Sequence, residues 1–326
     1  MDTPDNLAEN EKVPLIRYPR FKELHDEIRL CQRMTAIAGE PQCMALEGVP
    51  GAGKTTLALD YTALFPRVET DEGTTIPVFY VETPSPVTVK GMACHLLRVL
   101  GDPAADKGTL PAMNARLIGL IKDCGVQLVI LDDFHHLIDS ETNHILSAVS
   151  DWLKVLIKET KAPFLVVGIE GKVELILEAN AQLARLFAAR QTLQPFAWEP
   201  AQTATIEEFA RFIEYVEQAK LPLAQAMPRT ELLYRIYYAT GGVVAHIMNL
   251  MNLAAVLAGE RGQEEIGPDI LSLAFKKRLA RPMKGKVNPF EVDGDGRFTP
   301  PAPKPQVGGR KGQERLSSIS ATLTTK

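Results

Sequence analysis

The chain has 326 residues, of which 45% are hydrophobic and 23% are charged, and its formal net charge is −4. This composition is ordinary for a globular protein of about two domains, and it excludes collagen-like and wholly disordered classes. No window reaches the roughly 20 uninterrupted apolar residues of a membrane helix, and the polar N-terminal stretch does not resemble a secretory signal. Four cysteines form no Cys-x-x-Cys pair. We therefore expect a cytoplasmic protein without membrane contact, disulfide framework or zinc site.

Charge is distributed unevenly along the chain. From Lys276 to the end, 12 Lys or Arg residues stand against 4 acidic residues, so this part carries +8 and the rest −12. A basic segment on an acidic body predicts contact with nucleic acid or with an acidic partner surface. A solvated tail that only aids solubility fits the same pattern, so both interpretations stay open.

The first 200 residues alternate between helical and strand-like patterns. Residues 1–13 are polar and predicted to be disordered, and near-helical apolar spacing follows over 21–38. Short apolar runs that are typical of strands occupy 43–47, 78–81, 128–131 and 164–167, and helical patterns occupy 55–65, 87–100, 114–123 and 143–158. Apolar strands separated by helices predict a parallel sheet that is covered on both faces.

The pattern changes after residue 200. No further β-rich run occurs, and four segments have helical spacing: 206–219, 230–239, 243–258 and 268–279. Repeated proline and glycine then mark an extended segment. We therefore predict a disordered N-terminus over 1–13, an α/β core over 14–200, an all-helical domain over 201–280 and a basic Pro/Gly-rich tail over 281–326.

A glycine-rich motif lies between the first apolar strand and a helix. Residues 48–55, Gly-Val-Pro-Gly-Ala-Gly-Lys-Thr, satisfy the pattern G-x-x-x-x-G-K-[ST] of phosphate-binding loops. Glycines let the backbone wrap a phosphate closely, and the following helix adds its positive N-terminal end. The motif predicts ATP and Mg²⁺ as cofactors: Lys54 reaches the β- and γ-phosphates, the Thr55 hydroxyl ligates Mg²⁺, and Thr56 donates to the α-phosphate. The other predicted cofactor-binding residues are Gly48, Pro50, Gly51, Ala52 and Gly53.

Two carboxylates follow the apolar run 128–131. Mg²⁺ bound to a nucleotide needs an acidic group nearby, so we predict that Asp132 completes the metal site and that Asp133 orients or deprotonates the attacking water. A simple helix N-cap is the alternative. His135 and His136 come next, but adjacent histidines point in different directions and Mg²⁺ prefers oxygen ligands, so a zinc site is not expected here.

With these motifs in order, the chain resembles an AAA+ ATPase, and more narrowly the TniB/TnsC family of bacterial transposition regulators. The resemblance covers about residues 14–280 and includes the phosphate loop, Leu-Asp-Asp-Phe-His-His-Leu at 131–137, Asn-Ala-Gln-Leu-Ala-Arg at 180–185, Thr-Gly-Gly at 240–242 and Asn-Pro-Phe at 288–290. It implies an AAA+ P-loop NTPase with a parallel sheet flanked by helices, a small all-helical lid domain and an extended basic tail.

The resemblance also implies a function. Members of this family assemble with ATP into helical or ring homo-oligomers on double-stranded DNA, bind a target-selection protein of the TniQ type and recruit the transposase. Hydrolysis then remodels or dismantles the assembly. The implied protein is a bacterial, cytoplasmic ATPase that regulates DNA transposition.

Several site residues follow from the resemblance alone. An arginine of the neighbouring subunit contacts the γ-phosphate, and Arg185 is the candidate with Arg190 as its rival. His246 stands where relatives often carry an arginine that senses the γ-phosphate, so it is a candidate cofactor-binding residue, and a packed core histidine is the alternative. A polar sensor is expected at the end of the strand 164–167, and Glu170 is the candidate. Asp133 replaces the usual glutamate, which implies slow hydrolysis. DNA contacts fall within about 84–116, and the candidates are Lys90, Thr109 and Arg116.

Two other functions compete with this one. A small-molecule kinase would need an acceptor-binding motif, and the sequence shows none. A signalling or partner-remodelling P-loop ATPase without a DNA role remains the alternative.

Overall fold

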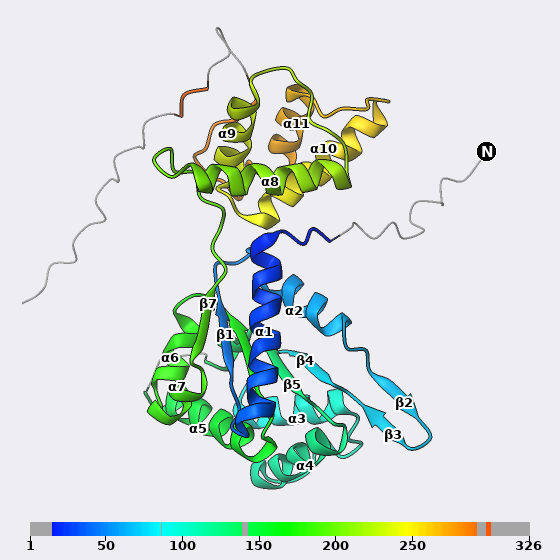
Figure 1. The fold of residues 1–326 in the computed structure, drawn as a ribbon, viewed down its shortest axis with the longest axis vertical. Coiled ribbons are helices and arrows are strands. Elements are labelled where there is room, and N and C mark those ends of the chain that lie inside the picture. The colour runs from blue at the N-terminus through cyan, green and yellow to red at the C-terminus, as the bar shows by residue number, and fades with distance from the viewer. Residues whose placement is uncertain (1–14, 86, 139–142, 292–297, 301–326) are drawn as a thin grey trace, which may run out of the picture.

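The computed structural model describes residues 15–85, 87–138, 143–291 and 298–300. The predicted disordered N-terminus, 1–13, and residues 301–326 of the predicted tail lie outside the described residues. Within them, an α/β core and a smaller helical domain follow each other along the chain, and a long N-terminal helix runs from their junction along the core (Figure 1).

The core is built on a parallel sheet of five strands. These are β1 (Met44–Glu47), β4 (Val78–Glu82), β5 (Leu128–Asp132), β6 (Phe164–Gly168) and β7 (Ala189–Thr192), in the spatial order β4-β5-β6-β1-β7. Every recorded pairing between them is parallel. Because β6 lies between β1 and β5, the segments that follow these three strands meet at one edge of the sheet.

Helices cover both faces of the sheet, as the apolar runs predict. One apolar cluster joins one face to α1 (Pro19–Ala38) and α2 (Lys54–Ala63). The other joins the opposite face to α3 (Val89–Leu100), α4 (Leu110–Asp123), α5 (Asn143–Thr160), α6 (Lys172–Glu178) and α7 (Ala181–Leu186). Neighbouring residues of β5 alternate between the two clusters, Ile130 facing one and Leu131 the other, since successive side chains of a strand point to opposite faces.

Several short elements were not predicted. They are the hairpin of β2 (Val68–Thr70) and β3 (Gly73–Thr75), the 3₁₀ turn η1 (Phe134–Leu137), the helices α6 and α7, and the edge strand β7. Strand β7 reads Ala-Arg-Gln-Thr and is partly exposed along its length, so it has no apolar run to identify it. Helix α3 begins at Val89, two residues later than predicted, because the Thr88 hydroxyl caps it and accepts a hydrogen bond from the Gly91 amide at 3.1 Å.

The helical domain comprises α8 (Thr203–Ala219), α9 (Arg229–Thr240), α10 (Val244–Glu260) and α11 (Pro268–Arg278). Part of the segment beyond the predicted boundary at residue 280 packs on it. Phe290 is 3% exposed, the Asn288 amide donates to the Ser272 hydroxyl at 2.9 Å, and buried Arg235 donates to the Pro289 carbonyl at 3.0 Å. The basic segment is therefore anchored on this domain at least as far as Glu291.

No single helix among the described residues is long and apolar enough to cross a membrane. Helices α9 and α10 satisfy the length and composition test only as a pair bent by 115°.

Candidate functional site

The glycine-rich loop connects β1 to α2 at the carboxyl edge of the sheet. Gly51 and Gly53 have φ angles of +81° and +104°, a region that favours glycine. A Cβ atom on Gly48 would lie 2.4 Å from the Leu193 carbonyl oxygen, so a larger residue would displace the chain that leaves β7. The loop is thus held against β1 and the residues after β7 in a conformation that requires glycine.

Lys54 is the first residue of α2, and its side chain turns back toward the loop. The residue is 7% exposed, and its Nζ donates to the carbonyls of Gly48 and Val49 at 2.8 and 3.0 Å. Burial lowers the pKa of Lys54, while the negative charges of Asp132 and Asp133 act in the opposite direction. The charge of Lys54 and those of Asp132, at the end of β5, and Asp133, the next residue, therefore influence one another.

Asp132 ends β5 and is 1% exposed. Its two carboxylate oxygens accept separate hydrogen bonds: the Tyr80 hydroxyl donates to Oδ2 at 3.0 Å, and the Asp133 amide donates to Oδ1 at 2.8 Å. Burial first, and then the Asp132 charge, raises the pKa of Tyr80, so this hydroxyl remains a donor. Tyr80 lies on β4, and no local sequence pattern ties it to an aspartate 52 residues away.

Asp133 has a left-handed backbone conformation, with φ +48°, at the start of η1. Its carboxylate is 36% exposed and faces His135, whose Nδ1 lies 3.9 Å from Asp133 Oδ1. Burial lowers the pKa of His135, and the neighbouring His136 lowers it further. Asp133 therefore presents its carboxylate beside an imidazole whose cationic form is disfavoured.

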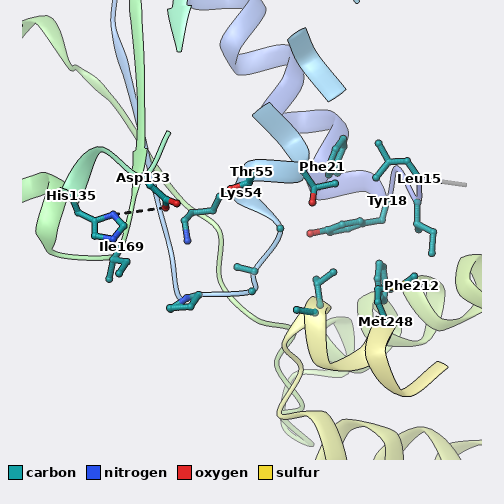
Figure 2. A pocket seen from close by; sticks show the side chains of 18 of the residues that line it. Leu15, Tyr18, Phe21, Lys54, Thr55, Asp133, His135, Ile169, Phe212 and Met248 are labelled. Carbon is teal, nitrogen blue, oxygen red and sulfur yellow. Dashed lines mark ion pairs between the residues drawn. The ribbon is translucent and has the colours of Figure 1, made fainter. Parts of the chain in front are cut away.

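A cavity of about 640 Å³ lies between the core and the helical domain (Figure 2). Lys54, Thr55, Asp133 and His135 form the polar end. The other end is mainly apolar and is lined by Leu15, Ile16, Tyr18, Phe21, Phe212, Val244, Ala245 and Met248. A volume in this range and a division into polar and apolar ends suit a small ligand with one charged part.

A nucleoside triphosphate with Mg²⁺ fits these residues. The loop offers backbone amides and a lysine to phosphates, and the Thr55 hydroxyl and the Asp132 carboxylate are the oxygen ligands that Mg²⁺ prefers. The apolar end offers aromatic and aliphatic side chains to a base. Among the described residues, no group of three or more His, Cys, Asp or Glu side chains is arranged to hold a metal ion by itself.

The predicted site residues fall into two groups. The cavity is lined by Pro50, Gly51, Ala52, Gly53, Lys54, Thr55, Thr56 and Asp133. Gly48, Asp132, Glu170 and His246 are not among its lining residues; Gly48 binds Lys54 through its carbonyl, and the Gln194 amide donates to Glu170 at 3.1 Å. The His246 ring turns to its own domain, with Nδ1 3.1 Å from the Thr240 carbonyl. Its role toward the nucleotide stays a prediction.

Sequence reasoning missed the residues of the apolar end. Leu15 and Ile16 precede α1, Phe212 belongs to α8 and Met248 to α10. In the sequence they are ordinary apolar residues of separate elements, and only the placement of the helical domain over the core brings them together.

The predicted arginines lie on the surface of the core, away from the cavity lining. Arg185 on α7 has a side chain that is 74% exposed and an ion pair with Glu40 at 3.1 Å. Arg190 on β7 is 36% exposed and pairs with Glu174 at 3.3 Å and with Glu178 at 3.5 Å.

Of the predicted DNA contacts, Lys90 on α3 and Thr109 before α4 are exposed. Arg116 is engaged within its own subunit, because it pairs with Asp102 at 2.8 Å and donates to the carbonyls of Ala104 and Lys107.

The fold and the phosphate-loop geometry define an AAA+ P-loop protein, and comparison with solved structures agrees. Cdc6p from Pyrobaculum aerophilum aligns with a TM-score of 0.57 at 17% identity, over 83% of this chain and 70% of that one. The Aeropyrum pernix ORC1 protein, solved in complex with DNA, aligns with a TM-score of 0.55 at 14% identity, over 82% and 68% of the two chains. At these identities the likeness establishes the fold alone.

The family is given by the sequence. The family model described as bacterial TniB protein matches residues 7–197, and the chain belongs to the TniB family. No curated protein matches it in sequence.

Proposed function

We propose that this TniB-family chain is an ATP-dependent AAA+ regulator of DNA transposition. With ATP it assembles on duplex DNA, links a target-selection protein of the TniQ type to the transposase, and is remodelled when ATP is hydrolysed. The observation that carries the proposal is the position of Lys54 and Asp133 on the wall of one cavity, beside buried Asp132, in a chain of this family.

The phosphate loop and the two aspartates have proposed roles. Lys54 and the loop amides bind the phosphates, and Thr55 and Asp132 hold Mg²⁺. When bound, Mg²⁺ neutralises charge on the phosphates. Tyr80 keeps one oxygen of Asp132 oriented, and Asp133 acts on the water that attacks the γ-phosphate. Aspartate is one methylene shorter than glutamate, so we propose that hydrolysis is slow.

We propose that assembly places Arg185 of one subunit against the γ-phosphate of the next. Its exposure supports this role, because an exposed guanidinium that pairs with an exposed glutamate, Glu40, leaves that contact at little cost. Arg190 is flanked by two glutamates and is the rival. Arg185→Ala should leave ATP binding by the monomer unchanged and reduce ATP-dependent assembly by at least about tenfold, measured by analytical ultracentrifugation. Unchanged assembly would transfer the role to Arg190, for which Arg190→Ala is the matched variant.

Contact with DNA is proposed to involve phosphates rather than bases. Lys90 and Thr109 are exposed and available, whereas Arg116 would have to leave Asp102. Such binding should weaken steeply as the salt concentration rises, because counterions are released from the duplex. The ORC1 relative was solved in complex with DNA, which supports the same use of this fold.

The test is electron microscopy of the purified protein with duplex DNA, with and without a non-hydrolysable ATP analogue. We expect ordered assemblies with the analogue and DNA together, and none with the Lys54→Ala variant. Absence of DNA-dependent assembly despite saturating nucleotide would refute the proposal. Tight nucleotide binding without any response to DNA would favour the alternative, a signalling or partner-remodelling ATPase.

A further inference from the structure

His135 lies on the cavity wall beside Asp133, and no role has yet been assigned to it. It lines the same end of the cavity as Lys54 (Figure 2), and its side chain is 14% exposed. The ring turns one nitrogen, Nδ1, toward the Asp133 carboxylate at 3.9 Å. This nitrogen is enclosed and has no hydrogen-bond partner among the described residues.

An enclosed ring nitrogen without a partner is costly, so its surroundings suggest which proton it carries. Nδ1 faces the acceptor Oδ1 of Asp133. The distance between the two atoms is 3.9 Å, which exceeds that of an N–H···O hydrogen bond by roughly 1 Å. A small rotation of either side chain would close the bond. A proton on Nδ1 that is donated to Asp133 leaves the lone pair on Nε2, because the hydrogen bond of one ring nitrogen sets the state of the other.

The position of His135 also bears on the short side chain of Asp133. A glutamate at this position would carry its carboxylate one methylene further from the backbone, and the aspartate stops short of that place. The imidazole beside Asp133 supplies a second ring nitrogen, Nε2, on a residue that lines the same cavity. Burial lowers the pKa of His135, so the ring stays neutral near pH 7 and Nε2 remains able to accept a proton.

On the basis of the ATP hydrolysis proposed above, we propose that His135 is a catalytic residue and that Asp133 acts through it. Asp133 accepts the Nδ1 proton and orients the ring, and Nε2 binds the attacking water. As the water oxygen bonds to the γ-phosphorus, its proton passes to Nε2. The bond from that phosphorus to the bridging oxygen breaks, and ADP leaves with the electron pair. His135 then returns the proton to solvent.

The experiment compares substitutions at both positions in the full-length protein. His135→Asn retains a polar group near Nδ1 but has no atom at Nε2, whereas His135→Gln places an amide near Nε2. Asp133→Glu restores the longer carboxylate, and the double variant combines it with His135→Asn. His144→Asn, at an exposed position on α5, is the control. The measurements are phosphate release under saturating ATP, the affinity for a fluorescent ATP analogue and the melting temperature.

We expect His135→Asn to lower kcat by roughly 100-fold with the nucleotide affinity within about threefold of the parent, as for loss of one acid–base group. His135→Gln should lower kcat less than His135→Asn does. With glutamate at position 133, His135→Asn should lower kcat by less than about threefold, since the carboxylate then reaches the water directly.

Four outcomes would overturn the assignment. These are parental turnover by both His135 variants, an equal loss in the two backgrounds, loss of nucleotide affinity together with turnover, or a parent that binds ATP without hydrolysing it. A parent that does not bind ATP at all would refute the proposed function itself, and the role of His135 with it.

Discussion

The α/β core and the helical domain line the same cavity with different kinds of side chain. The core supplies Lys54, Thr55, Asp133 and His135, and the helical domain supplies Phe212, Val244, Ala245 and Met248. All the charged groups on the wall therefore come from one domain, and the other contributes apolar surface. In the proposed function, the core would therefore carry the phosphate chemistry, and the helical domain would contact the rest of the ligand.

Backbone contacts couple the two regions. The Ala245 amide donates to the carbonyl of Gly51 at 3.0 Å, which joins the start of α10 to the phosphate loop. The Phe196 amide, on the chain between the domains, donates to the carbonyl of Gly242 at 2.9 Å. Arg20 on α1 bridges the same junction, since it donates to the Gln194 carbonyl at 2.9 Å and to Glu208 on α8 at 2.6 Å. A ligand that displaces the phosphate loop would therefore also shift the start of α10 in the helical domain.

The largest effect on ATP binding is expected from substitution of Lys54, the lysine of the phosphate loop. Lys54→Ala should weaken ATP binding by roughly 100-fold, because a buried charge-assisted contact is worth on the order of 3 kcal/mol. Equilibrium binding of a fluorescent ATP analogue measures the loss. Lys90→Ala, at an exposed lysine of the same domain, is the matched control for nucleotide binding. Affinity retained by Lys54→Ala would contradict the division of roles between the domains.

A change at the carboxylate should separate binding from turnover. Asp133→Asn preserves the shape of the side chain and should reduce hydrolysis by roughly 100-fold or more while ATP binding stays within a few fold. Single-turnover phosphate release together with equilibrium binding tests both parts. Hydrolysis at the parental rate would mean that Asp133 does not act on the water, either directly or through His135.

A smaller effect is expected from the helical domain. Met248→Ala removes apolar surface at the cavity and should raise the Kd for ATP by about five- to tenfold, roughly 1 kcal/mol, without changing the turnover of bound ATP. Val256→Ala is the control, since Val256 lies on the same helix and is 57% exposed. A large loss of turnover with Met248→Ala would show that the helical domain takes part in the chemistry.

Much of the core could be predicted because its signals are local. The loop 48–55 and the aspartates 132–133 are short runs that directly follow apolar strands, and the carboxyl ends of parallel strands share an edge of the sheet. The parallel sheet with helices on both faces was predicted and is confirmed. Strand β7 was not, because it is a short, partly exposed edge strand whose pairing with β1 replaces the missing apolar pattern.

The other residues of the candidate site could not be predicted, because they come together through contacts between distant segments. Tyr80 meets Asp132 only because β4 pairs with β5 in register. Leu15 and Met248 line one cavity only because the helical domain lies next to the N-terminal segment. Apolar side chains carry no directional chemistry in the sequence, so their partners are decided by packing. By itself the sequence determined the phosphate-loop motif and predicted the class of ligand, through glycines, a lysine and carboxylates whose chemistry is fixed at their own positions. Only the tertiary structure decided which residues line the cavity and which histidine stands beside Asp133.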